Sequence, residues 1–231
     1  MSEDGASTHD GRRRAILAID TATTQVVIAT GSPMGVVDGV STWEAGHRHG
    51  ETLLPAIRRF LGEQNLRRSR LTGIIVGTGP GAFTGLRVGI ATAKGLAHAL
   101  GIPLAGVSTG EALLSAAGSE RGVLLLPAGP SDRLVVRAGL GAMSLPAGRE
   151  PDVAEDEILI AVDLDGRAPA HALERGATAR AGLGAALIRL GAERLEAATP
   201  ASLAELVPDY VTLPRGVRSV EGSVAWSRDH R

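Results

Sequence analysis

The chain has 231 residues, of which 44% are hydrophobic, and a formal net charge of -1. This length can bury a sizeable core, and the near-neutral charge argues against strong unaided binding to RNA, so any RNA role should be shared with a partner. The chain contains no cysteine, which excludes disulfides, a thiol nucleophile and thiolate metal ligands. The charged start has no apolar signal segment and no apolar run approaches a membrane span, so we expect a soluble cytoplasmic protein with no membrane contact.

The first third of the chain predicts an antiparallel meander. Residues 1–13 are polar and without periodicity, and we expect them to be disordered. Residues 15–19, 26–30 and 34–43 are rich in β-branched side chains and are joined by short polar turns.

Alternating helices and strands follow. Residues 49–61 place their apolar side chains on one helical face. Residues 71–79 form a short apolar run, which predicts a buried strand. Residues 83–100 are a second predicted helix, which Gly101 ends, and residues 103–107 are a further strand. Ser108 and Glu111 then form a predicted capping box for a third helix. A meander continued by crossovers indicates a mixed sheet with helices on its faces.

After about residue 120 the pattern becomes rich in alanine and glycine. Residues 122–129, 132–139 and 157–164 predict three strands, and residues 177–190 predict a helix. A short helix is predicted at 203–207, and residues 213–231 are a tail.

Residues 77–89, GTGPGAFTGLRVG, are rich in glycine and join a strand to a helix. A phosphate-binding P-loop would need a Lys-Ser/Thr pair, which this segment lacks. Gly77, Gly79 and Ala82 fit the dinucleotide fingerprint, but the next strand ends in Val107 and Ser108 without a carboxylate for a ribose. A tight turn whose glycines relieve steric limits is the simpler interpretation.

The helix at residues 83–100 has two distinct stripes. Arg87, Ala91, Lys94 and His98 form a narrow basic stripe, whereas the apolar side chains occupy much of the remaining surface. Such a helix is buried on more than one side, either by its own sheet and neighbouring helix or by another subunit.

Four segments resemble the TsaB (YeaZ) family: AIDTATTQVVIA, HRHGETLLPAI, GTGPGAFTGLRVGIATAKGLA and GVSTGEAL, which lie in that family's order over about residues 15–117. The resemblance implies an α/β, actin-like ASKHA (ribonuclease H-like) fold with two lobes, each a mixed sheet with flanking helices, the second lobe reduced. We expect the lobes at residues 14–118 and 119–212. The second lobe departs from the family pattern, since it lacks the family's DAR-x-x-EVY-like strand.

The resemblance also implies a non-catalytic subunit that binds and activates TsaD in the N6-threonylcarbamoylation of adenosine 37 of tRNA, with TsaE as a further partner and tRNA bound through the complex. The chain lacks an HxxxH metal motif, since His47 and His49 are only two residues apart. An enzyme of the same fold, either a nucleotide-binding phosphotransferase or a glycoprotease-like hydrolase, is the alternative.

The family's partner contact is carried by two helices of the first lobe, and the same face could form a homodimer when TsaD is absent.

No cofactor is expected, although Asp20, Thr21 and Thr23 lie where relatives of this fold bind ATP or ADP with magnesium, so a vestigial nucleotide site is an alternative. The basic tail around Trp226 is expected to be solvated rather than bound to tRNA. The predicted partner-interface residues are Leu53, Ile57, Arg87, Ala91, Lys94, Gly95 and His98.

Overall fold

The structure is a computed structural model that describes residues 14–44, 46, 49–119, 121–198, 206–209 and 211. The predictions for residues 1–13 and 213–231, and for His47, lie outside the described residues. No helix in the described ranges is long and apolar enough to cross a membrane.

The first sheet has five strands: β1 (Ala15–Asp20), β2 (Gln25–Gly31), β3 (Val37–Glu44), β4 (Leu71–Gly77) and β5 (Leu104–Val107). Their order is β3-β2-β1-β4-β5. β1, β2 and β3 pair antiparallel, whereas β4 lies parallel to both β1 and β5. The predicted meander with parallel crossovers is confirmed.

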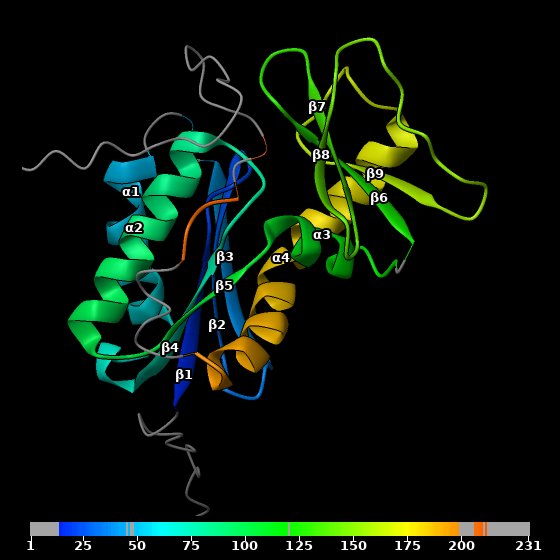
Figure 1. Cartoon of the computed structure of the whole chain (residues 1–231). Coiled ribbons are helices and arrows are strands. Elements are labelled where there is room, and N and C mark those ends of the chain that lie inside the picture. Colours follow the sequence, from blue (N-terminus) through cyan, green and yellow to red (C-terminus); the bar gives the residue numbers. More distant parts are fainter. Residues whose placement is uncertain are drawn as a thin grey trace, which may run out of the picture.

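Two helices cover one face of this sheet, α1 (His49–Glu63) and α2 (Phe83–Leu100) (Figure 1). Side chains from both helices and from β1, β2, β4 and β5 form one apolar core, which includes Leu17, Ile74 and Ile90. The bounds of α2 agree with the prediction. Gly101 ends the helix in the left-handed conformation, with φ 63°, where glycine has no steric penalty.

A short 3-10 helix, η1 (Arg68–Arg70), precedes β4, and α3 (Thr109–Ala116) follows β5. The Ser108 hydroxyl accepts a hydrogen bond from the Glu111 N–H at 3.3 Å, which is one half of the predicted capping box. The Glu111 carboxylate instead pairs with Arg194 at 2.5 Å.

The second sheet repeats the start of the first with fewer elements. It contains β6 (Gly122–Pro127), β7 (Arg133–Arg137), β8 (Gly141–Leu145) and β9 (Ile158–Ala161), in the order β8-β7-β6-β9. β6, β7 and β8 form an antiparallel meander, and β9 runs parallel to β6. The described residues supply no fifth strand to this sheet, and a segment without helix joins β8 to β9 where the first lobe has α1. The sequence did not predict β8.

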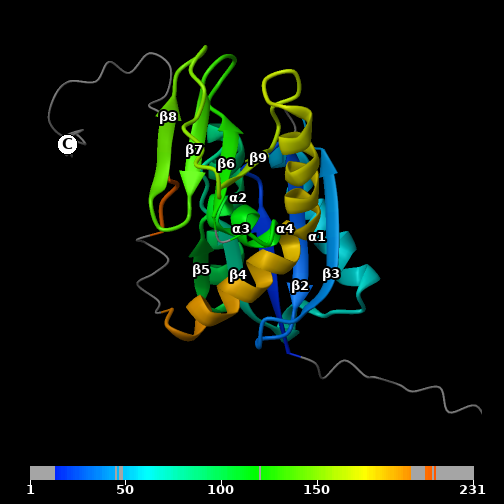
Figure 2. The same cartoon turned by 90° about the vertical axis from the view of Figure 1, so that its right-hand side faces the viewer.

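The last helix, α4 (Ala170–Glu196), is much longer than the predicted 177–190. Figure 2 shows it passing from the second sheet to the first. Its first half approaches β9, because a Cβ at Gly176 would lie 1.7 Å from the Ala161 carbonyl oxygen. Its second half packs on the face of the first sheet opposite α1 and α2, where Ile188 and Leu187 join the central core. The helix therefore ties both lobes together.

Candidate functional site

The turn between β1 and β2 packs directly onto the glycine-rich segment at residues 77–89. Because β1 and β4 are parallel neighbours, the loops that follow them meet at the same edge of the sheet. The Ala82 N–H donates to the Ala22 carbonyl oxygen at 2.7 Å, and the Thr21 hydroxyl donates to the Gly85 carbonyl oxygen at 2.7 Å. The two segments are thus joined by hydrogen bonds in both directions.

The glycines permit this close approach. A Cβ at Gly77 would lie 1.8 Å from a carboxylate oxygen of Asp20, and one at Gly85 would lie 2.0 Å from the Thr21 carbonyl oxygen. A Cβ at Gly89 would lie 2.2 Å from the Thr21 hydroxyl oxygen. No side chain larger than hydrogen fits at these positions without a shift of the turn. The partner of this glycine segment is therefore the protein's own hairpin.

Asp20 is fully buried at the centre of this contact. Its Oδ2 accepts from the Thr109 hydroxyl at 2.6 Å, and its Oδ1 accepts from the Ala22 N–H at 2.9 Å. Burial raises the pKa of the Asp20 carboxyl to about 6, and the two hydrogen bonds offset part of that rise. Through Thr109, Asp20 joins the end of β1 to the start of α3.

The three residues of the predicted nucleotide site come together in this turn. Asp20, Thr21 and Thr23 are each exposed by 4% or less, and the Thr23 hydroxyl donates to the Gln25 carbonyl oxygen at 2.9 Å. A phosphate or a hydrated magnesium ion here would have to displace these internal hydrogen bonds. In this structure these side chains therefore stabilise the turn itself.

No group of three or more His, Cys, Asp or Glu residues that could hold a metal ion occurs in the part of the chain that the structure describes.

The exposed face of α2 carries most of the predicted interface residues. Arg87, Ala91, Gly95 and His98 are exposed, and Lys94 is half-buried. A Cβ at Gly95 would meet no atom within 4 Å. The Arg87 guanidinium lies 3.8 Å from the centre of the Phe83 ring, which orients this side chain at the start of the helix.

Two predicted interface residues on α1 lie elsewhere. Leu53 and Ile57 belong to the core between the helices and the sheet, so the prediction that they form the contact surface is corrected. The helical period places them on the face that meets the sheet, together with Phe60. Leu54 has 51% of its surface exposed and is the large apolar side chain that α1 presents outward.

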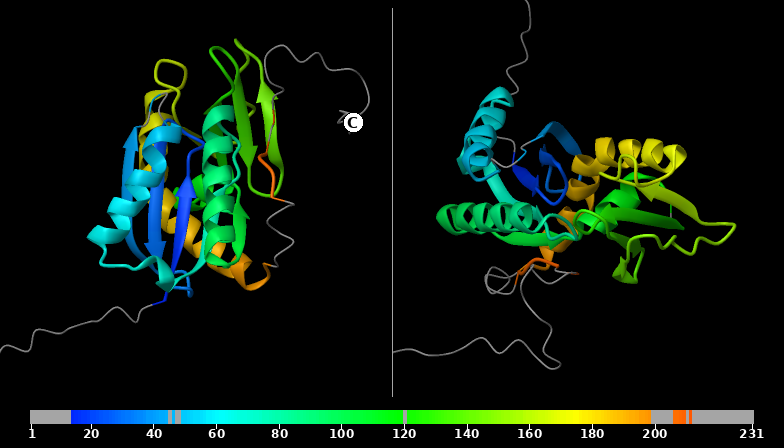
Figure 3. Two further views of the ribbon diagram at one scale, coloured as in Figure 1. Left: turned by 90° about the vertical axis from the view of Figure 1, so that its left-hand side faces the viewer. Right: turned by 90° about the horizontal axis from the view of Figure 1, so that it is seen from above.

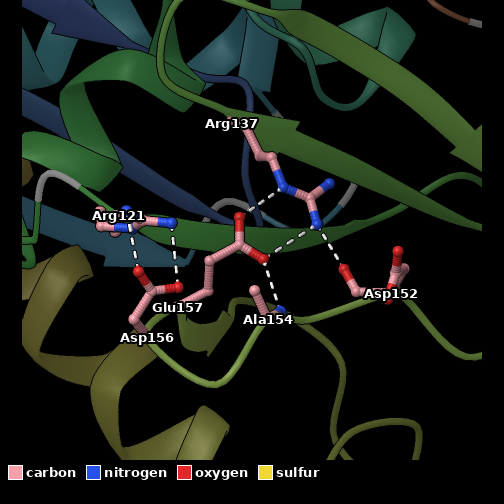
Figure 4. Close-up of polar contacts among 6 residues, drawn as sticks. All are labelled: Arg121, Arg137, Asp152, Ala154, Asp156 and Glu157. Atoms are coloured by element: carbon pink, nitrogen blue, oxygen red, sulfur yellow. Dashed lines mark hydrogen bonds and ion pairs between the residues drawn. The ribbon is translucent and has the colours of Figure 1, made fainter.

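The sequence did not predict two polar clusters in the second lobe. In the first, Arg137 of β7 donates to the Glu157 carboxylate at 2.8 Å and to the Asp152 carbonyl oxygen, and Arg121 pairs with Asp156 at 2.8 Å (Figure 4). The bond from Arg137, aided by one from the Ala154 N–H, holds the pKa of Glu157 at about 2. This cluster fastens the β8–β9 segment to β7.

In the second cluster, Asp163 follows β9 and reaches across to the first lobe. Its carboxylate accepts from the N–H of Thr24 at 2.7 Å and from the Thr24 hydroxyl at 2.8 Å, and it pairs with Arg180 of α4 at 2.8 Å. We call these three residues the interlobe link. Partners 139 positions apart carry no signal in a single sequence.

The comparisons with known proteins agree with this architecture. Residues 16–210 match the family described as TsaD, tRNA N6-adenosine threonylcarbamoyltransferase. The tRNA threonylcarbamoyladenosine biosynthesis proteins TsaB of Bacillus subtilis and Escherichia coli are 36% and 38% identical to the chain over 98 and 95 residues, which is 42% and 41% of the chain. The matches cover 42% and 40% of those relatives, so the chain spans less than half the length of the curated relatives it matches. The solved structure of YeaZ from Pseudomonas aeruginosa superposes with a TM-score of 0.64 at 23% identity, over 85% of this chain and 99% of that one.

Proposed function

Because the chain belongs to the TsaB (YeaZ) branch of the TsaD-type tRNA N6-adenosine threonylcarbamoyltransferase family, we propose that it is a non-catalytic subunit that binds and activates TsaD. In this proposal TsaE joins the complex, tRNA is bound through the complex, and the modification takes place in the cytoplasm. No cofactor is assigned to the chain itself.

The exposed face of α1 and α2 carries the proposal. The two helices lie side by side on one face of the first sheet, and their outer surface is free of other elements of the described chain (Figure 3). Small exposed residues, Ala91, Gly95 and Ala99, permit another helix to approach closely. Leu54 adds an apolar contact, and Arg87 and His98 supply charge and hydrogen bonding at the two ends of the stripe. A standard interface buries about 1,600 Å² in total, which two helices of this length can supply in large part.

The buried state of the β1–β2 turn supports a non-catalytic role. The oxygens that would meet a nucleotide are used to hold the turn against α2 and α3.

Substitution on α2 tests the interface. Ala91→Arg or Gly95→Arg places a long charged side chain where the partner helix should approach, and we expect at least a hundredfold loss of affinity for TsaD, because several residues of the stripe lose contact together. The measurement is co-purification with tagged TsaD, followed by the mass of the complex.

The matched control is Ala177→Arg, at an exposed alanine in the second-lobe half of α4. Circular dichroism of all three variants checks that they fold. A stoichiometric complex retained by both α2 variants would overturn the interface. The masses of the chain alone and with TsaD also decide whether the same face forms a homodimer.

Calorimetry with Mg-ATP separates this proposal from the phosphotransferase alternative. Tight binding that is lost in Asp20→Asn, together with turnover, would favour an enzyme. A hydrolase would instead show turnover without any partner present.

A further inference from the structure

Arginines at one end of the first lobe have no side-chain partner among the residues that the structure describes, whereas most of the other described arginines have one. The chain's arginines in the second lobe and in α4 are mostly engaged: Arg133, Arg137, Arg167, Arg175, Arg180, Arg189 and Arg194 each donate to a carbonyl, hydroxyl or carboxylate oxygen. Six others form no ion pair or side-chain hydrogen bond with the residues the structure describes, and one of them, Arg149, lies in the second lobe. The remaining five, which we call the arginine patch, are Arg14, Arg58, Arg67, Arg68 and Arg70.

Three separate segments bring the arginine patch together. Ala15 and Leu71 are neighbours in the parallel pairing of β1 and β4, so Arg14 and Arg70, which precede them, enter the sheet at the same edge. Arg67 and Arg68 belong to the turn that leads into β4. The end of α1, the connecting segment and the start of β1 lie at the same end of the molecule (Figure 3).

The α1 member of the patch extends it toward the proposed partner face. Arg58 is exposed and lies one helical turn after Leu54, on the same side of α1. The patch therefore continues from the helix face that the proposed function assigns to TsaD.

Few carboxylates neutralise this surface. Glu63 pairs with Arg59 at 3.6 Å, so that pair contributes no net charge. Glu193 and Glu196 lie near the end of α4, which packs on the opposite face of the sheet, where Leu195 meets Gly73. The arginine patch thus brings five positive charges together in a chain whose net charge is only -1, although Glu51 at the other end of α1 lies on the same helix.

We propose that the arginine patch is a contact surface for the phosphate backbone of tRNA. The inference rests on the proposed function, because membership of the complex brings a tRNA beside this subunit. Guanidinium groups that have no partner among the described residues suit phosphate groups, to each of which they can donate two hydrogen bonds. Contacts of this kind fix the position of the nucleic acid and read no sequence, which fits a subunit that serves many tRNAs. The near-neutral whole chain explains why the contact acts only within the complex.

The test is a triple substitution, Arg67→Gln, Arg68→Gln and Arg70→Gln, in the complex with TsaD. The matched control is Arg121→Gln, Arg149→Gln and Arg175→Gln in the second lobe, which changes the net charge by the same amount. The probe is an unmodified tRNA transcript, and its affinity is measured over a range of salt concentrations. Each lost phosphate contact should lower the salt slope by about 0.7 to 0.9, so we expect the patch variant to lose about 2 units of slope and at least tenfold in affinity at low salt.

Co-purification separates a failure of this inference from a failure of the proposed function. If neither variant forms a complex with TsaD, and the unsubstituted chain does not either, the proposed function fails. If the complexes form and the patch variant binds tRNA as the control does, the patch proposal is overturned. Equal losses in both variants would assign the effect to net charge and overturn it as well. Binding of the chain to phosphatidylglycerol vesicles through these arginines, with tRNA affinity unchanged, would mark the patch as a lipid contact instead.

Discussion

At the scale of single residues, the glycines of GTGPGAFTGLRVG are explained by the β1–β2 turn that packs against them. The sequence favoured a tight turn over a P-loop, but it could not show that the hairpin after β1 fills the space above the glycines. The same limit explains the error at Leu53 and Ile57. Helical periodicity shows which residues of α1 share a face. It does not show which face packs against the protein's own sheet, as Leu53 and Ile57 do, and which face is open to a partner.

Two glycines of α2 give the first residue-scale prediction. Gly85→Ala should destabilise the chain by about 2 kcal/mol or more, because its Cβ would meet the backbone oxygen of Thr21, which cannot move without the whole turn. Gly95→Ala should stabilise it by up to about 1 kcal/mol, because the site is open and alanine favours the helix. Urea unfolding of the isolated chain measures both, and equal midpoints for the two variants would refute the close-packing account.

The carboxyl of Asp20 gives a pH dependence with a defined sign. Its pKa is about 6 in the folded chain and 3.8 in a model peptide, so the folded state holds this proton more tightly. The free energy of unfolding should therefore fall as pH rises from about 4 to above 6, by about 2 kcal/mol from this group. In Asp20→Asn this decrease should be absent, since the amide keeps an acceptor for the Ala22 N–H and does not titrate. Unfolding curves at pH 4.5 and 7.5 measure the slope, and the same slope in both proteins would count against it.

At the scale of elements, local sequence signals correctly predicted the helices and strands that have clear ends. α2 was predicted with its observed bounds because Gly101 marks its end, and the three strands of the meander were located by their β-branched side chains. β8, GAMSL, was missed because it is short, half-exposed and without strong alternation. α4 was predicted too short because Gly176 and Gly191, which flank the predicted helix, lower helix propensity, although Gly182 inside it did not prevent the prediction. Those glycines instead allow the helix to approach β9, α3 and β4 more closely than a larger residue would.

At the scale of the whole molecule, a repeated meander and one long helix explain both the reduced second lobe and its attachment. The resemblance predicted two lobes with a mixed sheet in each, which the structure confirms. It could not predict how the lobes are held, because α4 and the interlobe link join positions far apart in the chain. The central core contains Ile75 of the first sheet, Leu124 of the second and Leu187 of α4, so the two sheets share one packing unit.

The interlobe link gives a prediction about how tightly the lobes are joined. Asp163→Asn keeps a residue type that tolerates the φ of 58° at this position, but it removes one acceptor for Thr24 and the charge that pairs with Arg180. Since hydrogen bonds to charged groups contribute about 1.5 to 3 kcal/mol, the Thr24 amide should exchange with solvent at least tenfold faster. The control, Asp165→Asn, changes an exposed carboxylate two positions later that forms no ion pair with the described residues. Hydrogen exchange of both variants at equal pH measures the effect. Equal protection of Thr24 in the two variants would show that α4 and the shared core hold the lobes without this link.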